Sequence, residues 1–547
     1  MAIDQILKRV NRLEAARSPW LDHWQEILDY VMPRKAEITA NYTKGAKRTE
    51  KLFDSTAVHA NTLLAASLQG TLTSASLPWF HLRVRDETLN SMQEVQVWLE
   101  DCRNRMYKEF NSSNFSTEVH EFYLDICSIG TACLEVEEIP ETQGFSFRTL
   151  HISEYYVIEN ERGMIDTVYR KFQYSARQAF LKWGKACGTK CMEAYKSDPD
   201  KKFTFIHAVM PVGEYKGKIA TKLPWLSIYI SVDDKNILSE GGYNELPYLV
   251  TRWAKASGEE YGRSPAYNAL PDIKTLNKAV ELGLRTWAKV LDPPLLVEDD
   301  GIIGRVSTKP GGITVIRRDG ALKPLVLAAK FDVSDMKETE KRQSIRQAFF
   351  ADQLELQQGP QMTATEVQVR YELMQRLLGP TLGRFQTEFL NPLVERCFGM
   401  MQRNENFLPA PEAIEGAAID VEYVGPLARS QRMEEAVAVE RLYEMVANLA
   451  QIAPEIMDNL NHDEAIRSRA ELLGVPKTIL KDYREVQQIR QQRMEQQQQQ
   501  AQMEQMQVGA DMASKVGPAT EALKPANVEA SQEGIAKIME ALGAQGG

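Results

Sequence analysis

Apolar residues recur at helical spacing in four segments of the first part of the chain. These segments are Ile3 to Val31, Asp54 to Leu72, Val95 to Phe110 and Ser116 to Ile129. From Phe145 to Leu249 the pattern changes to short alternating or β-branched runs separated by turn residues, which is typical of strands. Residues 1–260 are therefore predicted to form an α+β region.

A long helix with a clear start and a clear end is predicted in the middle of the chain, at 261–292. Ser264 can cap its free amides, and Pro265 fits its first position. The sequence Asp292-Pro293-Pro294 forbids its continuation. A Gly-rich segment with short β-like runs follows at 293–332.

The rest of the chain is predicted to be mainly helical. A second helix at 333–356 is closed by Gly359-Pro360, and a long return helix with a strand after it is expected at 363–425. Residues 426–482 are again expected to be helical. The whole chain is therefore predicted to be an α+β protein in which helices predominate.

The C-terminal part differs from the rest in composition. Gln487 to Gln507 holds twelve Gln among twenty-one residues, within a predicted helix at 483–507. Such a polar helix is either held by like neighbours or frayed. Residues 508–547 are small and polar, and are expected to be a flexible tail.

Composition and cysteine spacing indicate a protein that folds in water with reduced thiols. Hydrophobic residues make up 43% and charged residues 26% of the 547 residues, which is ordinary for a globular chain. The six cysteines lie at irregular spacings, and no signal segment is visible near Met1. No run approaches the roughly 18 apolar residues of a membrane span, so no membrane contact is expected.

The charge distribution argues against a protein that coats nucleic acid over its whole surface. The formal net charge is −10, whereas such a binder needs a broad cationic field. The segment from Tyr267 to Phe350 differs, because it holds fourteen Lys or Arg and eleven Asp or Glu. The middle of the chain is therefore where an acidic polymer would be tolerated best.

The sequence offers little support for an enzyme. It has no Gly-x-x-x-x-Gly-Lys-Ser/Thr loop, and Gly184 to Lys190 has the wrong spacing for one. The pairs Asp233-Asp234 and Asp299-Asp300 could be imagined as nuclease metal ligands, but adjacent acids point in different directions and no third ligand lies nearby. They are interpreted as solvated turns. No catalytic residue, metal or cofactor is expected.

Several local motifs occur in an order that spans Pro19 to Tyr483. They are Ser18-Pro19-Trp20 with Trp24 and Pro33, Asp54-Ser55-Thr56 with Leu63, Ala66 and Gly70, Trp79-Phe80, Ser128-Ile129-Gly130-Thr131, Tyr261-Gly262-Arg263-Ser264-Pro265, Pro293-Pro294, Met362-Thr363-Ala364-Thr365-Glu366-Val367, Leu378-Gly379-Pro380, Leu408-Pro409 and Gly474-Val475-Pro476. With these motifs the chain resembles the portal, or head-to-tail connector, family of short-tailed bacteriophages. Ser264 departs from the small residue, often Gly, expected there, which bears on the subfamily and not on the class.

The resemblance implies a ring, usually of twelve subunits, at one capsid vertex. Double-stranded DNA would be packaged into the procapsid through its channel and later ejected through the short tail. The implied partners are the major capsid protein, the terminase large subunit, tail adaptor and nozzle proteins, and internal core or scaffold proteins. The implied location is the virion, with assembly in the host cytoplasm. The alternative is another oligomeric phage component, namely a tail adaptor or an internal core or scaffold protein.

The family's named parts can be assigned to the predicted elements. They are a wing (1–260), two stem helices (261–292 and 333–356), a clip (293–332), a tunnel loop (357–362), a return helix with a wing strand (363–425), a crown (426–482), a barrel helix present in some members (483–507) and a tail (508–547).

The first stem helix carries two separate faces when its residues are placed at 100° intervals. Lys274, Lys278, Arg285 and Lys289 share a 60° arc with Glu281 among them, and we call these four residues the basic stripe. An apolar seam lies on another side and consists of Ile273, Val280, Leu284, Trp287 and Leu291. The stripe either faces DNA in the channel or is a solvated face that pairs with neighbouring acids.

The channel can be tested for size with simple geometry. Twelve helices at about 10 Å spacing give a centreline diameter of about 38 Å, and subtracting one helix diameter leaves about 27 Å. Duplex DNA would pass. Direct grip must be weak, because each neutralised phosphate strengthens binding and would slow translocation.

Further candidate residues lie beyond the first stem helix. Arg342 and Arg346 are expected to line the channel, and Phe349 and Phe350 to pack in the core. The tunnel loop comprises Gln357, Gln358, Gly359, Pro360, Gln361 and Met362. It either offers uncharged hydrogen-bond donors and acceptors to DNA or is an ordinary helix connection.

The clip has too few apolar residues for its own core and is expected to pair with neighbouring subunits. Its predicted docking residues for motor and adaptor are Gly301, Arg305, Lys309, Arg317 and Arg318.

Overall fold

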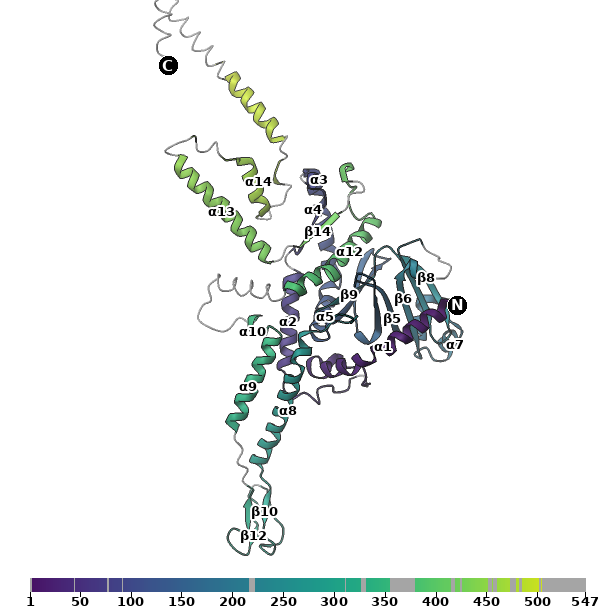
Figure 1. Cartoon of the computed structure of the whole chain (residues 1–547), viewed down its shortest axis with the longest axis vertical. Coiled ribbons are helices and arrows are strands. Elements are labelled where there is room, and N and C mark those ends of the chain that lie inside the picture. The colour runs from purple at the N-terminus through teal and green to yellow at the C-terminus, as the bar shows by residue number, and fades with distance from the viewer. Residues whose placement is uncertain are drawn as a thin grey trace, which may run out of the picture. The chain divides into compact units, whose positions relative to one another are not determined.

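The computed structural model describes most of the chain, and Figure 1 shows how its elements are arranged. The described residues are 2–43, 45–75, 78–90, 92–215, 222–309, 311–325, 331–354, 379–414, 419–423, 426–450, 455, 460–472, 479–481, 485–500 and 503. The chain divides into two compact units, Met1–Met457 and Asp458–Gly547. Helices predominate over strands, which confirms the predicted α+β class with a mainly helical chain.

The first unit contains long helices and several short helical turns. Their bounds are α1 (Ala2–Val31), η1 (Pro33–Lys35), α2 (Thr56–Leu72), α3 (Glu87–Asn90), α4 (Gln93–Ser112), α5 (Phe115–Ser128), η2 (Ile152–Glu154), α6 (Ala176–Trp183), η3 (Gly184–Cys187), α7 (Thr189–Ser197), η4 (Val212–Glu214), α8 (Pro265–Leu291), α9 (Phe331–Ala348), α10 (Ala351–Leu354), the π-helical η5 (Gln386–Leu390), α12 (Asn391–Arg403), η6 (Glu412–Ile414) and α13 (Pro426–Ala450).

The strands are β1 (Phe80–Val84), β2 (Thr131–Ile139), β3 (Gly144–Leu150), β4 (Tyr155–Glu159), β5 (Ile165–Ser175), β6 (Lys202–Pro211), β7 (Trp225–Ser231), β8 (Asn236–Tyr243), β9 (Tyr248–Arg252), β10 (Leu295–Val297), β11 (Ile302–Ile303), β12 (Val315–Ile316), β13 (Leu322–Pro324) and β14 (Ile419–Tyr423). They form a five-stranded sheet in the order β4-β5-β6-β7-β8, a three-stranded sheet in the order β3-β2-β9, and three two-stranded ribbons. All recorded pairings are antiparallel.

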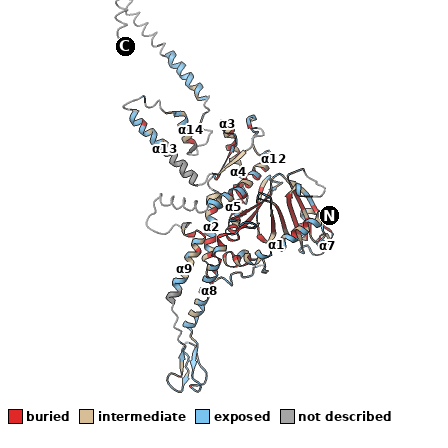
Figure 2. Ribbon diagram, in the orientation of Figure 1, coloured by how far each residue is buried: buried red, intermediate tan, exposed pale blue. Residues whose placement is uncertain are grey.

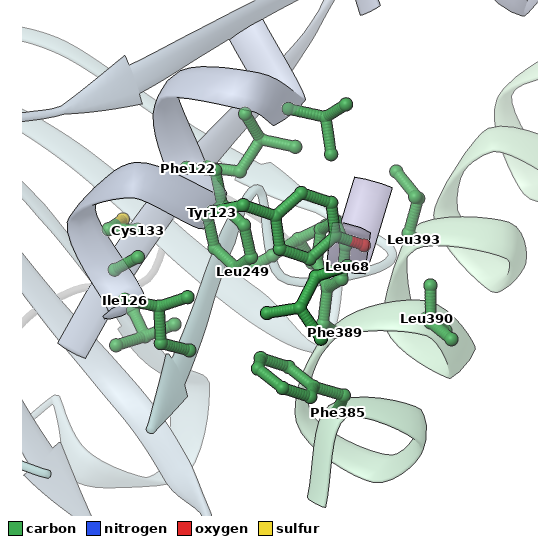
Figure 3. Close-up of a cluster of buried hydrophobic side chains, with 14 of the residues drawn as sticks. Leu68, Phe122, Tyr123, Ile126, Cys133, Leu249, Phe385, Phe389, Leu390 and Leu393 are labelled. Carbon is green, nitrogen blue, oxygen red and sulfur yellow. The ribbon is translucent and has the colours of Figure 1, made fainter. Parts of the chain in front are cut away.

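One core joins elements that are far apart in the sequence. Its buried side chains come from α2, α4 and α5, from the three-stranded sheet, from the first half of α8 and from α12. In Figure 3, Phe122 of α5 stacks on Phe389 of η5, with ring centroids 4.3 Å apart. Burial concentrates in this part, whereas α8 and α9 become exposed towards their common tip (Figure 2).

A buried ion network fastens the return helix to the sheets. The guanidinium of Arg252 on β9 lies 2.5 Å from a carboxylate oxygen of Glu388 and also pairs with Glu159. The main-chain N–H of Arg252 donates to Glu388 as well, at 2.9 Å. Glu388 lies in the π-helical turn η5. Such a turn re-aims a side chain within a helical run, which here brings the carboxylate to the buried arginine.

The second stem helix differs from its predicted extent. An unbroken helix at 333–356 was expected, but α9 ends at Ala348 and α10 starts at Ala351. At the break, Phe350 adopts a left-handed backbone with φ +59, which interrupts the helix. Phe349 is fully buried and Phe350 packs against the same core, so the prediction of core packing for both rings is confirmed.

The second unit contains α14 (His462–Leu472) and a helical segment at 485–500. That segment is the described part of the predicted Gln-rich helix, and its side chains are mostly exposed. Arg490 pairs with Asp463 of α14 at 2.5 Å.

Candidate functional site

The helical hairpin formed by α8 and α9 is the candidate functional site. The two helices lie side by side and end in a tip of four short strands (Figure 1). The start signals of α8 act as predicted: Ser264 accepts a hydrogen bond from the main-chain N–H of Ala266 at 3.2 Å, and Pro265 is the first helical residue. The helix ends at Leu291, before the two prolines.

The base of α8 is anchored where two of the sequence motifs meet. The Ser264 hydroxyl donates to the carbonyl of Ser128, and the Gly262 N–H donates to the Thr131 hydroxyl. A Cβ on Gly130 would lie 2.6 Å from the Ser264 nitrogen, and Gly130 has φ +88. Only glycine fits there. The motifs around Gly130 and Ser264 therefore encode one joint between the wing region and α8.

The apolar seam of α8 is buried in its first half and exposed in its second half. Ile273 is buried in the core. Farther along the same side, Leu284, Trp287 and Leu291 are 51%, 57% and 66% exposed. Exposed apolar side chains in a row mark a surface that another molecule covers.

The basic stripe lies on α8 with all four side chains exposed. Lys274 pairs with Glu26 on α1, which raises the pKa of the ammonium group. Lys278 and Arg285 both pair with Glu281, at 2.9 and 2.5 Å. Lys289 has no ion pair among the described residues. The alternative of a solvated face that pairs with acids thus applies to three of the four residues in the isolated subunit.

Arg342 and Arg346 on α9 face carboxylates of the same chain. Arg342 contacts Asp54 at 3.0 Å, and Arg346 contacts Asp352 at 2.7 Å. Burial opposes ionisation of Asp54, but hydrogen bonds from Thr56 and Arg342 outweigh it and hold the pKa of the carboxyl below its usual value. Both arginines border a pocket of about 330 Å³ beside the start of α2. Whether they line a channel stays a prediction.

Asn277, which the sequence gave no reason to single out, joins α8 to the loop before α2. Its side-chain oxygen accepts from the N–H groups of Phe53 and Asp54, at 2.7 and 3.2 Å. Its amide donates to the carbonyl of Lys51 at 2.7 Å. Since Arg342 of α9 pairs with Asp54, both α8 and α9 contact the same loop. An asparagine inside a helix carries no sequence signal for such a contact.

The tip consists of two short antiparallel ribbons, β10 with β13 and β11 with β12. Most of its large apolar side chains are exposed, and Ile313 is 85% exposed. Of the predicted docking residues, Gly301 is buried, while Arg305 and Lys309 are exposed. Arg317 and Arg318 are exposed but pair with Asp300 and Glu298. Two-stranded ribbons are marginally stable alone, which agrees with the expectation that the tip pairs with neighbouring subunits.

Other predicted features can be placed or lie outside the structure. The tunnel loop, Gln357 to Met362, lies outside the described residues. Asp233 and Asp234 lie in a turn, and their carboxylates accept hydrogen bonds from the main-chain N–H groups of Thr204 in β6 and Lys190 in α7, respectively. Within the described chain, no cluster of His, Cys, Asp or Glu is placed to hold a metal, and no helix could span a membrane. All six cysteines are buried free thiols.

Comparison with known proteins gives a consistent result over nearly the whole chain. Residues 3–480 match the family described as bacteriophage head to tail connecting protein. The chain is 31% identical over 529 residues to the probable portal protein of Bordetella phage BPP-1, covering 94% of this chain and 95% of that protein. It is 28% identical over 509 residues to the portal protein of Salmonella phage epsilon15, covering 89% and 90%.

Two solved structures show weak overall likeness. One is the virion of a native gene transfer agent particle, with a TM-score of 0.34, 13% identity and coverage of 82% of this chain and 99% of that chain. The other is the neck of an empty gene transfer agent particle, with a TM-score of 0.35, 11% identity and coverage of 74% and 90%.

The family match and the full-length relatives settle the class of protein, which is a structural connector of phage particles. The chain belongs to the bacteriophage head to tail connecting protein family, and its similarity to the two portal proteins extends over 94% and 89% of its length. The resemblance stated from the motifs is thereby confirmed.

Proposed function

We propose that copies of this chain form a portal ring at one capsid vertex, twelve in number as is usual in the family. Double-stranded DNA passes through its channel during packaging and ejection. The observation that carries the proposal is the exposed second half of α8, in a chain that matches the connector family over residues 3–480. It presents apolar side chains on one side and basic side chains on another.

The two faces of α8 have different tasks in this ring. The centres of the exposed apolar seam and of the basic stripe lie about 140° apart around the helix at 100° per residue. The seam residues Leu284, Trp287 and Leu291 pack on a neighbouring subunit, and the basic stripe faces the channel. Glu281 partly neutralises that stripe, which keeps the grip on phosphates weak and lets DNA slide.

The other parts contact the partners of packaging and assembly. The tip, with Gly301, Arg305, Lys309, Arg317 and Arg318, docks the terminase large subunit first and the tail adaptor and nozzle proteins later. Residues 357–362 form the tunnel loop, and Arg342 and Arg346 line the channel. The wing contacts the major capsid protein and internal core or scaffold proteins. The ring assembles in the host cytoplasm, and its role is structural, because a separate ATPase drives packaging.

Mass measurement and negative-stain imaging of the purified full chain test this proposal. A ring with an axial hole, close to twelve subunits in mass, is expected. A monomer, or an oligomer that lacks a protruding stem and an axial hole, would contradict it and favour a tail adaptor or an internal core protein.

A further inference from the structure

A second basic surface lies outside the helical hairpin. The segment inserted between β5 and β6 folds as α6, η3 and α7; together with Lys202, the first residue of β6, we call it the basic lobe (Ala176–Lys202). It holds seven Lys or Arg and three Asp or Glu, in a chain whose net charge is −10. All seven cationic side chains are exposed. They are Arg177, Lys182, Lys185, Lys190, Lys196, Lys201 and Lys202.

The cations of the basic lobe are not neutralised by ion pairs. Among the described residues, none of the seven lies within ion-pair distance of a carboxylate, whereas three of the four basic-stripe residues do. The nearby carboxylates bind main-chain N–H groups instead. Asp198 accepts from Asp200, and Asp233 accepts from Thr204, at 3.3 and 3.1 Å.

The basic lobe is held in place by a hydrophobic core of its own. Its helices pack on β5, β6 and β8 through a small core of their own, with Phe172, Cys187 and Phe205 among its buried members. Phe180 and Tyr195 stack with ring centroids 4.3 Å apart and brace α6 against α7. The lysines therefore stand on fixed elements. The aromatic rings are committed to packing, so they offer no platform on which bases of a single strand could stack.

The position of the basic lobe separates it from the channel wall. In Figure 1, α7 lies beyond β5, β6 and β8 as seen from α8 and α9. A stretch of DNA in contact with the hairpin would therefore not contact the lobe as well. In the proposed ring, with the hairpins around the axis, the lobe would lie on the outer side of the sheet.

We propose that the basic lobe is an outer contact site for duplex DNA, separate from the channel. This inference rests on the proposed function, which makes DNA the acidic polymer that this protein meets. Six of the seven cations are lysines, which act as point charges towards phosphates without reading sequence. Duplex DNA carries one negative charge per about 1.7 Å, so its backbone is attracted to exposed cations that have no ion pair among the described residues. DNA lying outside the ring would be held there weakly and without sequence preference.

Covalently closed circular duplex DNA tests this site, because it has no end that could thread into a channel. The full chain is used, and imaging confirms rings in each sample. The lobe variant carries Lys185→Gln, Lys196→Gln and Lys202→Gln. The matched control carries Lys47→Gln, Lys108→Gln and Arg162→Gln, which are also exposed and without an ion pair among the described residues. Binding is followed by electrophoretic mobility at several salt concentrations.

The wild type is expected to bind the circle, with affinity that falls steeply as salt rises. The lobe variant should lose at least about tenfold in affinity at low salt, with a salt slope lower by about 0.9 for each phosphate contact removed. The control variant should stay within about twofold of the wild type, since its cations lie elsewhere.

Two results would overturn the proposal. One is a wild-type ring that does not bind the circle, and the other is a lobe variant that binds it as well as the wild type. If rings ignore the circle but retain polyglutamate through the basic lobe, the lobe serves an acidic protein segment and not DNA. Samples without rings would instead speak against the proposed portal function, so the two failures are distinguishable.

Discussion

The main hydrophobic core of the first unit, which we call the wing core, and the hairpin of α8 and α9 treat charged and apolar side chains in opposite ways. In the wing core, charge is buried and satisfied within one chain: Arg252 binds Glu388 and Glu159. In the hairpin, apolar surface is left uncovered: Leu284, Trp287 and Leu291 are all more than half exposed. A fold that buries a charged arginine side chain could also bury an uncharged leucine side chain. In the proposed ring the exposed part of the apolar seam serves assembly, whereas the core is formed within one subunit.

The largest effect on this contrast is expected from substitutions in the exposed part of the apolar seam. The double change Leu284→Ser and Leu291→Ser should abolish rings, because each such side chain contributes about 1.5–3 kcal/mol when fully buried and is repeated around the ring. The subunit itself should stay folded, since both residues are exposed in it. Analytical ultracentrifugation and thermal unfolding measure the two effects.

The matched control for this change is Leu181→Ser, because Leu181 is 71% exposed but lies on α6 of the basic lobe. Rings should persist in that variant. If the seam variant still forms rings of normal mass, the seam is not the assembly surface and the contrast with the core fails.

The next largest effect is expected inside the wing core. Glu388→Ala leaves the buried Arg252 with only part of its charge balanced, and breaking a buried pair from one side costs about 3–5 kcal/mol. Chemical unfolding should be followed in the ring-deficient seam variant, so that assembly does not mask the loss. Arg403→Gln serves as control, because the Arg403–Glu245 pair is exposed and worth about 1 kcal/mol or less. Equal losses in both variants would contradict a special role for the buried network.

The sequence alone was informative where local chemistry decides structure. The Ser264 cap, the Pro265 start and the stop before Pro293 are short-range signals, and α8 follows them. The sequence could not show that Glu26 pairs with Lys274 or that Asp54 pairs with Arg342, because each partner lies hundreds of residues away. The break at Phe349–Phe350 also had no signal, since a left-handed phenylalanine depends on tertiary packing. No sequence pattern marks the basic lobe, because its cations are spread over two short helices, a 3-10 turn and the start of β6.

The smallest effect on DNA binding is expected from single substitutions in the basic stripe. Lys278 has an ion pair there, and Lys289 has none among the described residues. Lys289→Gln should weaken the binding of linear duplex DNA to rings more than Lys278→Gln does, by a few-fold at most, because Glu281 already shares the charge of Lys278. Excess circular DNA saturates outer sites during the measurement, so that the linear duplex reports on the channel. Lys337→Gln, which breaks a pair with Glu340 on α9, is the control and should have little effect. If Lys278 proves as important as Lys289, the pair with Glu281 does not survive in the ring. The basic stripe would then grip DNA with its full charge.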